Sequence, residues 1–199
     1  MKYDIKTYIK MELEAEMWSF THSIVDTAAG SAYIESKTHK ILCVVSSPSE
    51  FSELLTSEEY QRHAKAHLSV ISPHSSQVKD ALSSLIILEK YPKSVIEVKV
   101  QVIAGDEETA LVYIINAVSL AVIDSGIEIK DTLIAVSAGF QDGKVVIGVN
   151  QLVLGVLVNT DKIVLIRLEG VVDEVQAGML IQACFDTSKH MFQMVKNSY

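Results

Sequence analysis

The chain offers few residues whose type and spacing suit metal binding. His63 and His67 lie four residues apart and His74 follows, so two imidazoles could share one helical face as ligands. No third ligand stands at a spacing typical of a metal site. We interpret the three as surface histidines where a helix meets a strand, and we expect neither a metal nor a cofactor.

Nucleophilic catalysis and base stacking have equally little support. Ser119 and Ser137 have no histidine and acid nearby in a nucleophile-elbow context, so we interpret them as packing residues. The single tryptophan, Trp18, could stack on a nucleobase. Its neighbours Met17 and Phe20 instead favour packing in the core or at an interface.

The composition is typical of one compact domain spanning residues 1–199. With 49% hydrophobic residues, the chain has enough apolar material for a sizeable core. No apolar run approaches the ~20 residues of a membrane-spanning helix, and the residues from Met1 to Asp4 do not begin a secretory signal, so we expect a soluble intracellular protein without a membrane partner. Cys43 and Cys184 each stand alone in an apolar segment, which favours buried reduced thiols.

The net charge of −8 argues against a chain that binds RNA by itself, because non-specific affinity for RNA comes mainly from lysine and arginine. The densest set of lysines, Lys90, Lys93 and Lys99, is interrupted by Glu89 and Glu97, which is typical of a solvated surface. A mean hydropathy of +0.28 indicates that partners cover some apolar surface.

The apolar patterns predict short strands followed by a helix, twice over, and therefore an α+β fold. A first hairpin is expected to turn at 36–39, and a second at Asp142-Gly143, a pair that suits positive φ. The expected strands are 17–25, 30–35, a run from 40 that Pro48 stops, 67–72, 95–103, 152–158 and 162–168, with the second hairpin at 133–146. An acidic linker is expected at 49–59.

Three helices are expected, each with a start signal. Ser75 or Ser76 would cap the first, which carries apolar residues through Leu88 and ends before Tyr91-Pro92. Asp106 would cap the second, with one buried face and Gly126 in the left-handed turn after its end. Asp173 and Gln176 would form a capping box for the last.

Three blocks of the sequence resemble the RNase PH domain in order and spacing. They are the hairpin that starts at Gly30-Ser31-Ala32-Tyr33-Ile34-Glu35 and closes with Ser46-Ser47-Pro48, the stretch 101–127, and the stretch 133–146. The resemblance implies an α+β fold of the ribosomal protein S5 domain 2-like type, with two β-sheet/helix layers from two strand-then-helix halves. It also implies a scaffold whose active members degrade RNA with phosphate.

The residues that would hold phosphate are replaced. In active relatives the acidic loop continues as glycine-glycine-threonine-arginine, whereas here Glu107, Glu108, Thr109 and Ala110 stand at those places. Alanine lacks the bidentate, charge-assisted contact that arginine makes, and two carboxylates would repel the anion. Lys6 to Trp18 likewise replaces the arginine-rich entry motif of the family.

The catalytic acids are replaced as well. The resemblance places the first aspartate at Gly148 and the second at Leu154, or in the apolar run around it, and no acidic residue occurs between Asp142 and Asp161. Glycine and leucine can neither transfer a proton nor bind a metal. We therefore expect no catalytic residues and a protein that is not an enzyme.

Together, the resemblance implies a non-catalytic ring subunit of the eukaryotic RNA exosome, which processes and degrades RNA from the 3′ end. Its partners would be other RNase PH-type subunits in a six-membered ring, RNA-binding cap proteins, and RNA passing through the channel, in the nucleus, nucleolus and cytoplasm.

Two alternatives stay open. One is an active phosphorolytic exoribonuclease with relocated residues, which requires arginine near Asp106 although only Arg62 and Arg167 exist. The other is an unrelated binding module on the same fold.

Overall fold

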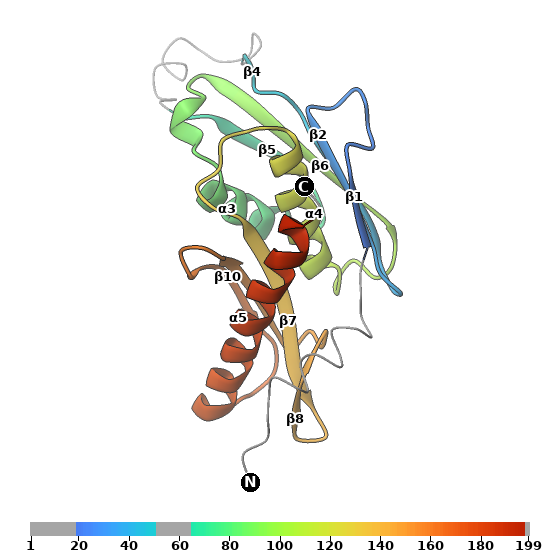
Figure 1. The fold of residues 1–199 in the computed structure, drawn as a ribbon, viewed down its shortest axis with the longest axis vertical. Helices are drawn as coiled ribbons and strands as arrows, with labels where there is room; N and C mark the ends of the chain where they lie inside the picture. The colour runs from blue at the N-terminus through green and yellow to red at the C-terminus, as the bar shows by residue number, and fades with distance from the viewer. Residues whose placement is uncertain (1–18, 51–64, 198–199) are drawn as a thin grey trace.

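The computed structural model describes residues 19–50 and 65–197, which form two β-sheets and three α-helices (Figure 1). In the first sheet the antiparallel order is β1-β2-β3-β6, β4 also pairs with β6, and β5 pairs with β6 in parallel. Its strands are β1 (Ser19–His22), β2 (Gly30–Glu35), β3 (Lys40–Val45), β4 (Ser49–Glu50), β5 (His67–Ile71) and β6 (Ser94–Ala104).

The second sheet is antiparallel throughout, in the order β10-β9-β7-β8. Its strands are β7 (Leu133–Gln141), β8 (Lys144–Ile147), β9 (Leu152–Leu157) and β10 (Lys162–Leu168). Every residue of β9 is buried, because helices cover both faces of this sheet. The predicted α+β class is confirmed.

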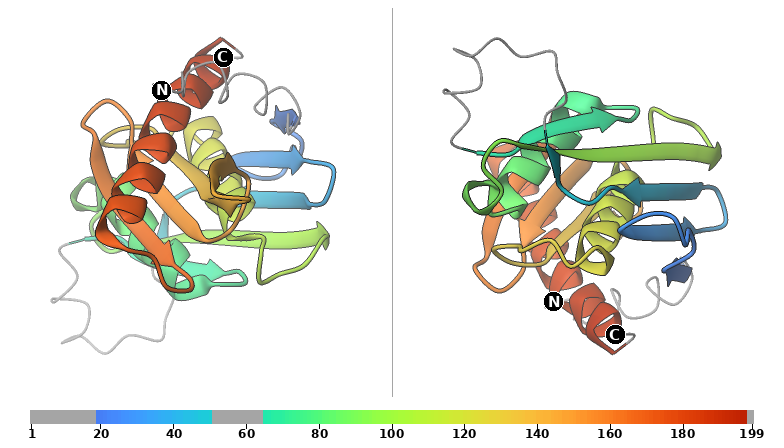
Figure 2. Two further views of the ribbon diagram at one scale, coloured as in Figure 1. Left: turned by 90° about the horizontal axis from the view of Figure 1, so that it is seen from below. Right: turned by 90° about the horizontal axis from the view of Figure 1, so that it is seen from above.

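The helices fill two layers. Helix α3 (Ser75–Leu85) and helix α4 (Leu111–Asp124) lie between the sheets, with α4 against β2, β3 and β7 and α3 against β5 and β10. Helix α5 (Glu174–Lys196) crosses the outer face of the second sheet (Figure 2). The predicted apolar face of α4 is buried as expected, but the rest of the helix is buried almost all round as well, because α4 contacts a sheet on each side.

Both predicted hairpins and the predicted capping box form in the structure. The first hairpin pairs Gly30 with Val45 and Glu35 with Lys40. Asp142 and Gly143 both adopt positive φ, 51° and 74°, as a tight two-residue hairpin turn requires. The capping box before α5 forms in full, since Gln176 N donates to Asp173 Oδ1 at 2.7 Å and Asp173 N donates to Gln176 Oε1 at 3.2 Å.

Three predicted boundaries were wrong. The first strand ends at His22 because Ser23 adopts φ of 54° and donates to the Asp124 carboxylate through its backbone and side chain. Helix α3 follows His74, whose φ is 57°, and neither Ser75 nor Ser76 caps it. The helix ends at Leu85, because Ile86 turns into an extended bridge with Ile129 and a short 3₁₀ turn, η1 (Leu88–Lys90), follows.

Some predictions fall outside the described residues, including those on Trp18, His63, Arg62 and the segment 6–18. Of the acidic linker, only Ser49 and Glu50 are described, and they form β4. No described helix is both long and apolar enough to cross a membrane. Cys43 and Cys184 are buried free thiols, as predicted.

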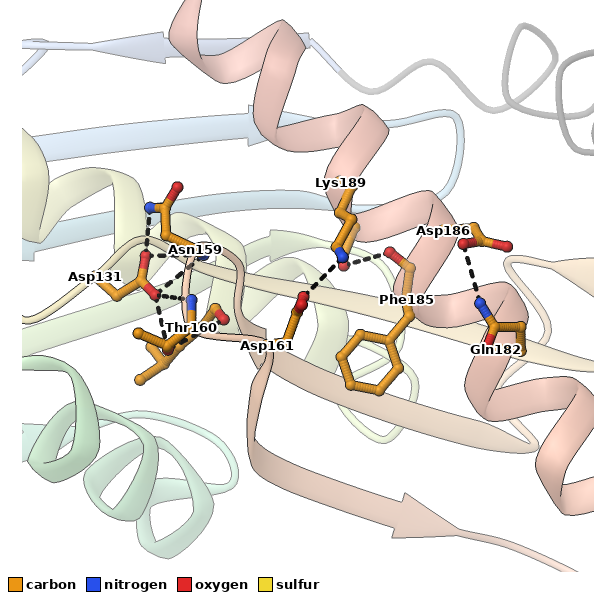
Figure 3. Close-up of polar contacts among 10 residues, drawn as sticks. Asp131, Asn159, Thr160, Asp161, Gln182, Phe185, Asp186 and Lys189 are labelled. Carbon is orange, nitrogen blue, oxygen red and sulfur yellow. Dashed lines mark hydrogen bonds and ion pairs between the residues drawn. The ribbon is translucent and has the colours of Figure 1, made fainter.

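A polar cluster around the buried Asp131 joins the start of β7 to the exposed β9–β10 turn (Figure 3). The Asp131 carboxylate accepts hydrogen bonds from Asn159 N and Nδ2, from Thr160 N and Oγ1, and from Thr132 N, at 2.6–3.2 Å. Burial opposes ionisation of Asp131, but these hydrogen bonds outweigh it and hold the pKa of the carboxyl below its ordinary value. Lys189 of α5 pairs with Asp161 of the same turn at 2.9 Å.

Candidate functional site

The loop that precedes α4 is where the resemblance places the phosphate-binding motif of active relatives. The Asp106 carboxylate accepts hydrogen bonds from Thr109 N and Thr109 Oγ1, both at 3.2 Å. A turn in which Ala110 N donates to Glu107 O lies between this contact and the helix, which begins only at Leu111. Asp106 therefore caps the turn and not α4, and that prediction was wrong.

Two histidines from distant segments hold this loop in place. His39, at the end of the first hairpin turn, brings Nε2 within 3.1 Å of Asp106 O and 3.0 Å of Thr109 Oγ1. His74, immediately before α3, brings Nε2 within 2.8 Å of Glu107 O. The imidazole of His39 is buried and stacks on Tyr113 of α4, with ring centroids 4.6 Å apart.

The histidine arrangement was not anticipated from the sequence. His39 stood there only as part of a polar turn, and His74 only as a weak candidate metal ligand. His67 lies exposed on β5, apart from this loop. Among the residues that the structure describes, no three histidine, cysteine or acidic side chains gather in a way that could hold a metal ion.

The four loop residues equivalent to the family's phosphate motif differ in exposure. Glu107 and Glu108 are exposed, whereas Ala110 is fully buried at the start of α4, where its carbonyl accepts a hydrogen bond from Ile114 N. Position 110 therefore contributes a small core side chain, and the charge that the loop presents to solvent is negative.

The stretch equivalent to the catalytic acids lies beside this loop. Asn150 Nδ2 donates to Thr109 O at 3.2 Å, which joins the residues after β8 to the loop. Gly148, two residues earlier, has φ of 93° and donates its amide to Ser137 O at 2.9 Å. The structure thus brings together the two regions that the resemblance associates with phosphate binding and acid catalysis.

Leu154 is fully buried in β9, where it pairs with Val136 and Ile166. Its neighbour Val153 lines the hollow beside the loop, and successive strand side chains point to opposite faces. Leu154 therefore faces away from that hollow. Of the apolar run named from the sequence, Val153 is the residue that reaches the candidate site.

The hollow itself is small, about 70 Å³, and has mixed charge. Its lining residues come from the loop, the start of α4, the turn after β8, β9 and the end of β10: Glu108, Thr109, Leu111, Asn150, Val153, Arg167 and Glu169. Arg167 Nη2 lies 2.6 Å from Glu169 Oε1. The guanidinium is thus already paired with a carboxylate, and Glu108 adds a second negative charge.

The remaining candidate nucleophiles lie in the core. Ser119 of α4 and Ser137 of β7 are both buried, which confirms their prediction as packing residues. Asn116, one turn before Ser119, makes paired hydrogen bonds of 2.8 and 2.9 Å with the backbone of Ala135. These contacts tie α4 to β7 and so fix the loop and the hollow relative to the second sheet.

Comparison with known proteins decides the family. The family described as "3′ exoribonuclease family, domain 1" (RNase PH) matches residues 16–128, more than half of the chain. This chain belongs to the RNase PH family. The matched stretch includes the first hairpin, the loop held by the two histidines and all of α4.

Curated relatives of this RNase PH chain include exosome components. It is 24% identical over 210 residues to "Exosome complex component Rrp41" of Cenarchaeum symbiosum, covering 93% of this chain and 86% of the relative. It is 31% identical over 170 residues to the protein of that name in Pyrococcus abyssi, covering 75% of this chain and 62% of the relative.

Solved structures of the same fold are similar over nearly the whole chain. Rice (Oryza sativa) Rrp46 superposes with a TM-score of 0.77 at 21% identity, covering 92% of this chain and 94% of that chain. A chain of an archaeal exosome core superposes with a TM-score of 0.67 at 13% identity, covering 96% of each. At these identities the likeness establishes the fold.

Proposed function

We propose that this RNase PH chain is a non-catalytic subunit of an RNA exosome core ring. Its place in an exosome is supported by relatives that carry the name of exosome components and by the likeness to a chain of an exosome core. In this role it forms part of the ring wall and of the channel through which RNA reaches a separately bound nuclease. The chain itself would have a structural role in 3′-to-5′ RNA processing and would catalyse no reaction.

The observation that carries the non-catalytic part is the charge and shape of the loop at 106–110. Asp106, Glu107 and Glu108 present carboxylates there, and Ala110 is buried where the family's arginine would stand. Phosphate binding requires positively charged or amide donors aimed at the anion. This loop offers the opposite charge, and Gly148 beside it has no side chain for acid catalysis.

A phosphorolysis assay tests this part of the proposal. The purified chain is incubated with a 5′-labelled single-stranded RNA and inorganic phosphate, and separately with nucleoside diphosphates for the reverse reaction. We expect neither shortening nor extension. Activity that co-purifies with the chain and disappears on replacing a residue of the hollow would contradict the proposal.

The alternative of an active enzyme with relocated residues has one observation in its favour. Arg167, distant in sequence from the loop, lies in the hollow beside Thr109 and Glu108. Its pairing with Glu169 at 2.6 Å argues against a role as a phosphate clamp. The variant Arg167→Gln decides the question, because an activity that requires Arg167 must be lost in it, whereas an inactive ring subunit has none to lose.

Assembly is the second part of the proposal. We expect this chain to form a stable 1:1 pair with a sister RNase PH-type subunit on co-expression, and to co-purify with RNA-binding cap proteins and channel-bound RNA. A ring of unequal subunits uses heterologous contacts, so each member has a forward and a backward surface. A monodisperse monomer that binds no sister subunit in size-exclusion chromatography with light scattering would favour an independent binding module.

The position in the ring and the localisation are the finer parts of the proposal. The segment Gly30–Glu35 is the basis for assigning the chain as the counterpart of the mRNA-transport-type subunit, whereas its relatives include proteins named Rrp41 and Rrp46. Identification of the two neighbours by cross-linking within the purified complex discriminates these positions. A fluorescent fusion tests the expected distribution between nucleus, nucleolus and cytoplasm.

A further inference from the structure

Strand β10 is a terminal strand with a free backbone edge. Within residues 19–50 and 65–197 it pairs only with β9, so the amides and carbonyls on its other side have no strand partner. It has seven residues, whereas the other terminal strands, β1, β4, β5 and β8, have four, two, five and four. β10 is therefore the longest free edge in the described fold.

Apolar side chains accompany this edge. Leu165 and Arg167 point toward the α3–α4 layer, since Leu165 is buried and Arg167 lines the hollow beside α4. Ile166 and Leu168 point to the opposite side and are 57% and 46% exposed. Val171, just beyond the strand, is almost fully exposed. The edge thus combines unpaired backbone groups with uncovered aliphatic side chains.

Proteins usually protect such an edge, because it is a template for pairing with another strand. β10 contains no proline and no carboxylate between residues 162 and 168. Its irregular register between Ile163 and Leu165 and the lysine at its start are the protective features that are present. The second half of the strand, with Ile166 and Leu168, keeps regular pairing with β9 and an open outer edge.

Charge distinguishes among the strands that could occupy this edge. β10 begins with Lys162, which forms no ion pair with another described residue, whereas Arg167 is already paired with Glu169. A second copy of β10 would bring another lysine to the pairing and no carboxylate. A strand with alternating apolar residues and a carboxylate opposite Lys162 fits both the side chains and the charge.

We propose that the edge of β10 binds an edge strand of a neighbouring RNase PH-type subunit and extends the second sheet across the subunit boundary. This inference rests on the proposed function, because it takes its partner from the ring. Main-chain hydrogen bonds would hold the added strand, and its apolar residues would pack on Ile166, Leu168 and Val171.

The matched variants Ile166→Lys and Ile71→Lys test this inference. Ile71 is 60% exposed at the end of β5, a terminal strand of the other sheet, so the two substitutions add the same charge at similar exposure. Each variant is co-expressed with the sister subunits, and its affinity for the subunit that pairs with the wild type is measured. We expect Ile166→Lys to weaken that pair at least about tenfold and Ile71→Lys to leave it unchanged.

Hydrogen exchange provides the second readout, since it reports strand pairing directly. Amides of residues 164–168 that point outward exchange fast in the isolated chain and should become protected in the complex. A pair that forms normally with Ile166→Lys and leaves these amides unprotected overturns the inference while the ring proposal stands. Protection that appears with rising concentration of this chain alone identifies a second copy as the occupant and also overturns it. Failure of the wild type to bind any sister subunit refutes the proposed function itself.

Discussion

The side-chain amide of Asn150 donates a 3.2 Å hydrogen bond to the backbone carbonyl of Thr109. This contact joins the loop before α4 to the residues after β8, so two regions about forty positions apart form one surface. The resemblance to active relatives associates these regions with a phosphate-binding arginine and an acid. Here they present Glu107, Glu108 and Gly148, and the predictions about catalysis follow from that replacement.

Restoring the arginine alone should not restore activity. Ala110 is fully buried at the start of α4, so Ala110→Arg must either bury a guanidinium or displace the loop. We expect a loss of about 2–4 kcal/mol in the free energy of unfolding and no phosphorolysis. The control Glu108→Arg adds the same side chain at an exposed position of this loop and should unfold like the wild type. Chemical denaturation and the RNA assay measure both effects, and phosphate-dependent RNA shortening by Ala110→Arg would contradict the prediction.

Two identical glycine substitutions should have opposite effects on stability. A methyl group at Gly30 would lie 2.3 Å from Ala121 O and 2.3 Å from Ser125 N, because the start of β2 packs directly on the end of α4. Gly30→Ala should therefore lower the free energy of unfolding by about 3 kcal/mol or more. Gly178 lies within α5 with nothing near its added methyl, so Gly178→Ala should raise it by about 0.5–1 kcal/mol. Thermal unfolding compares the two, and equal midpoints would refute the close approach at Gly30.

The Asp131 cluster should make stability depend on acidic pH. Because the folded-state pKa of this carboxyl is below its unfolded value, its stabilisation is present above pH ~4 and is lost as the pH falls through the folded-state pKa. Asp131→Asn should cost about 2 kcal/mol at pH 7, and the difference from the wild type should shrink in acid. Asp161→Asn alters only an exposed ion pair of the same turn and should cost under about 1 kcal/mol. A constant difference between pH 7 and pH 3 would count against the assigned role of Asp131.

The two cysteines should be unreactive until the chain unfolds. Burial raises the pKa of the Cys43 thiol far above its ordinary range and that of Cys184 to about 12, so almost no thiolate exists at pH 8. We expect no labelling by a thiol reagent in the native protein and labelling of both in denaturant. Ser76→Cys, exposed in the first turn of α3, serves as the positive control and should label at once. Rapid native labelling of Cys43 would show that the first sheet opens readily.

The parts of the fold that the sequence predicted correctly depend on local chemistry. The Asp142-Gly143 turn and the Asp173–Gln176 capping box each involve residues within three positions of one another. The start of α3 failed because Ser75 and Ser76 were equally plausible caps locally, and the position of His74 was decided by its contact with Glu107 across the fold. Local signals cannot report a partner thirty residues away.

The candidate site likewise has features that could be predicted from the sequence and features that depend on distant contacts. The resemblance to the family was enough to place Glu107, Glu108, Ala110 and Gly148 where active relatives have two glycines, an arginine and an aspartate. Their surroundings could not be predicted in this way, because His39 reaches Asp106 and Thr109 only after β3 and β6 have paired. Arg167 likewise enters the hollow only through the register of β10 on β9. No periodic pattern of residue types in the sequence predicts the contacts of His39 or the position of Arg167.

The backbone at Gly148 also limits which residues position 148 can accept. Its φ of 93° is a conformation that residues with a side chain adopt only at a cost of about 1–3 kcal/mol. Gly148→Asp would therefore introduce strain into the folded chain before the carboxylate could act in any reaction. The backbone after β8 thus favours glycine at position 148 independently of any chemistry nearby.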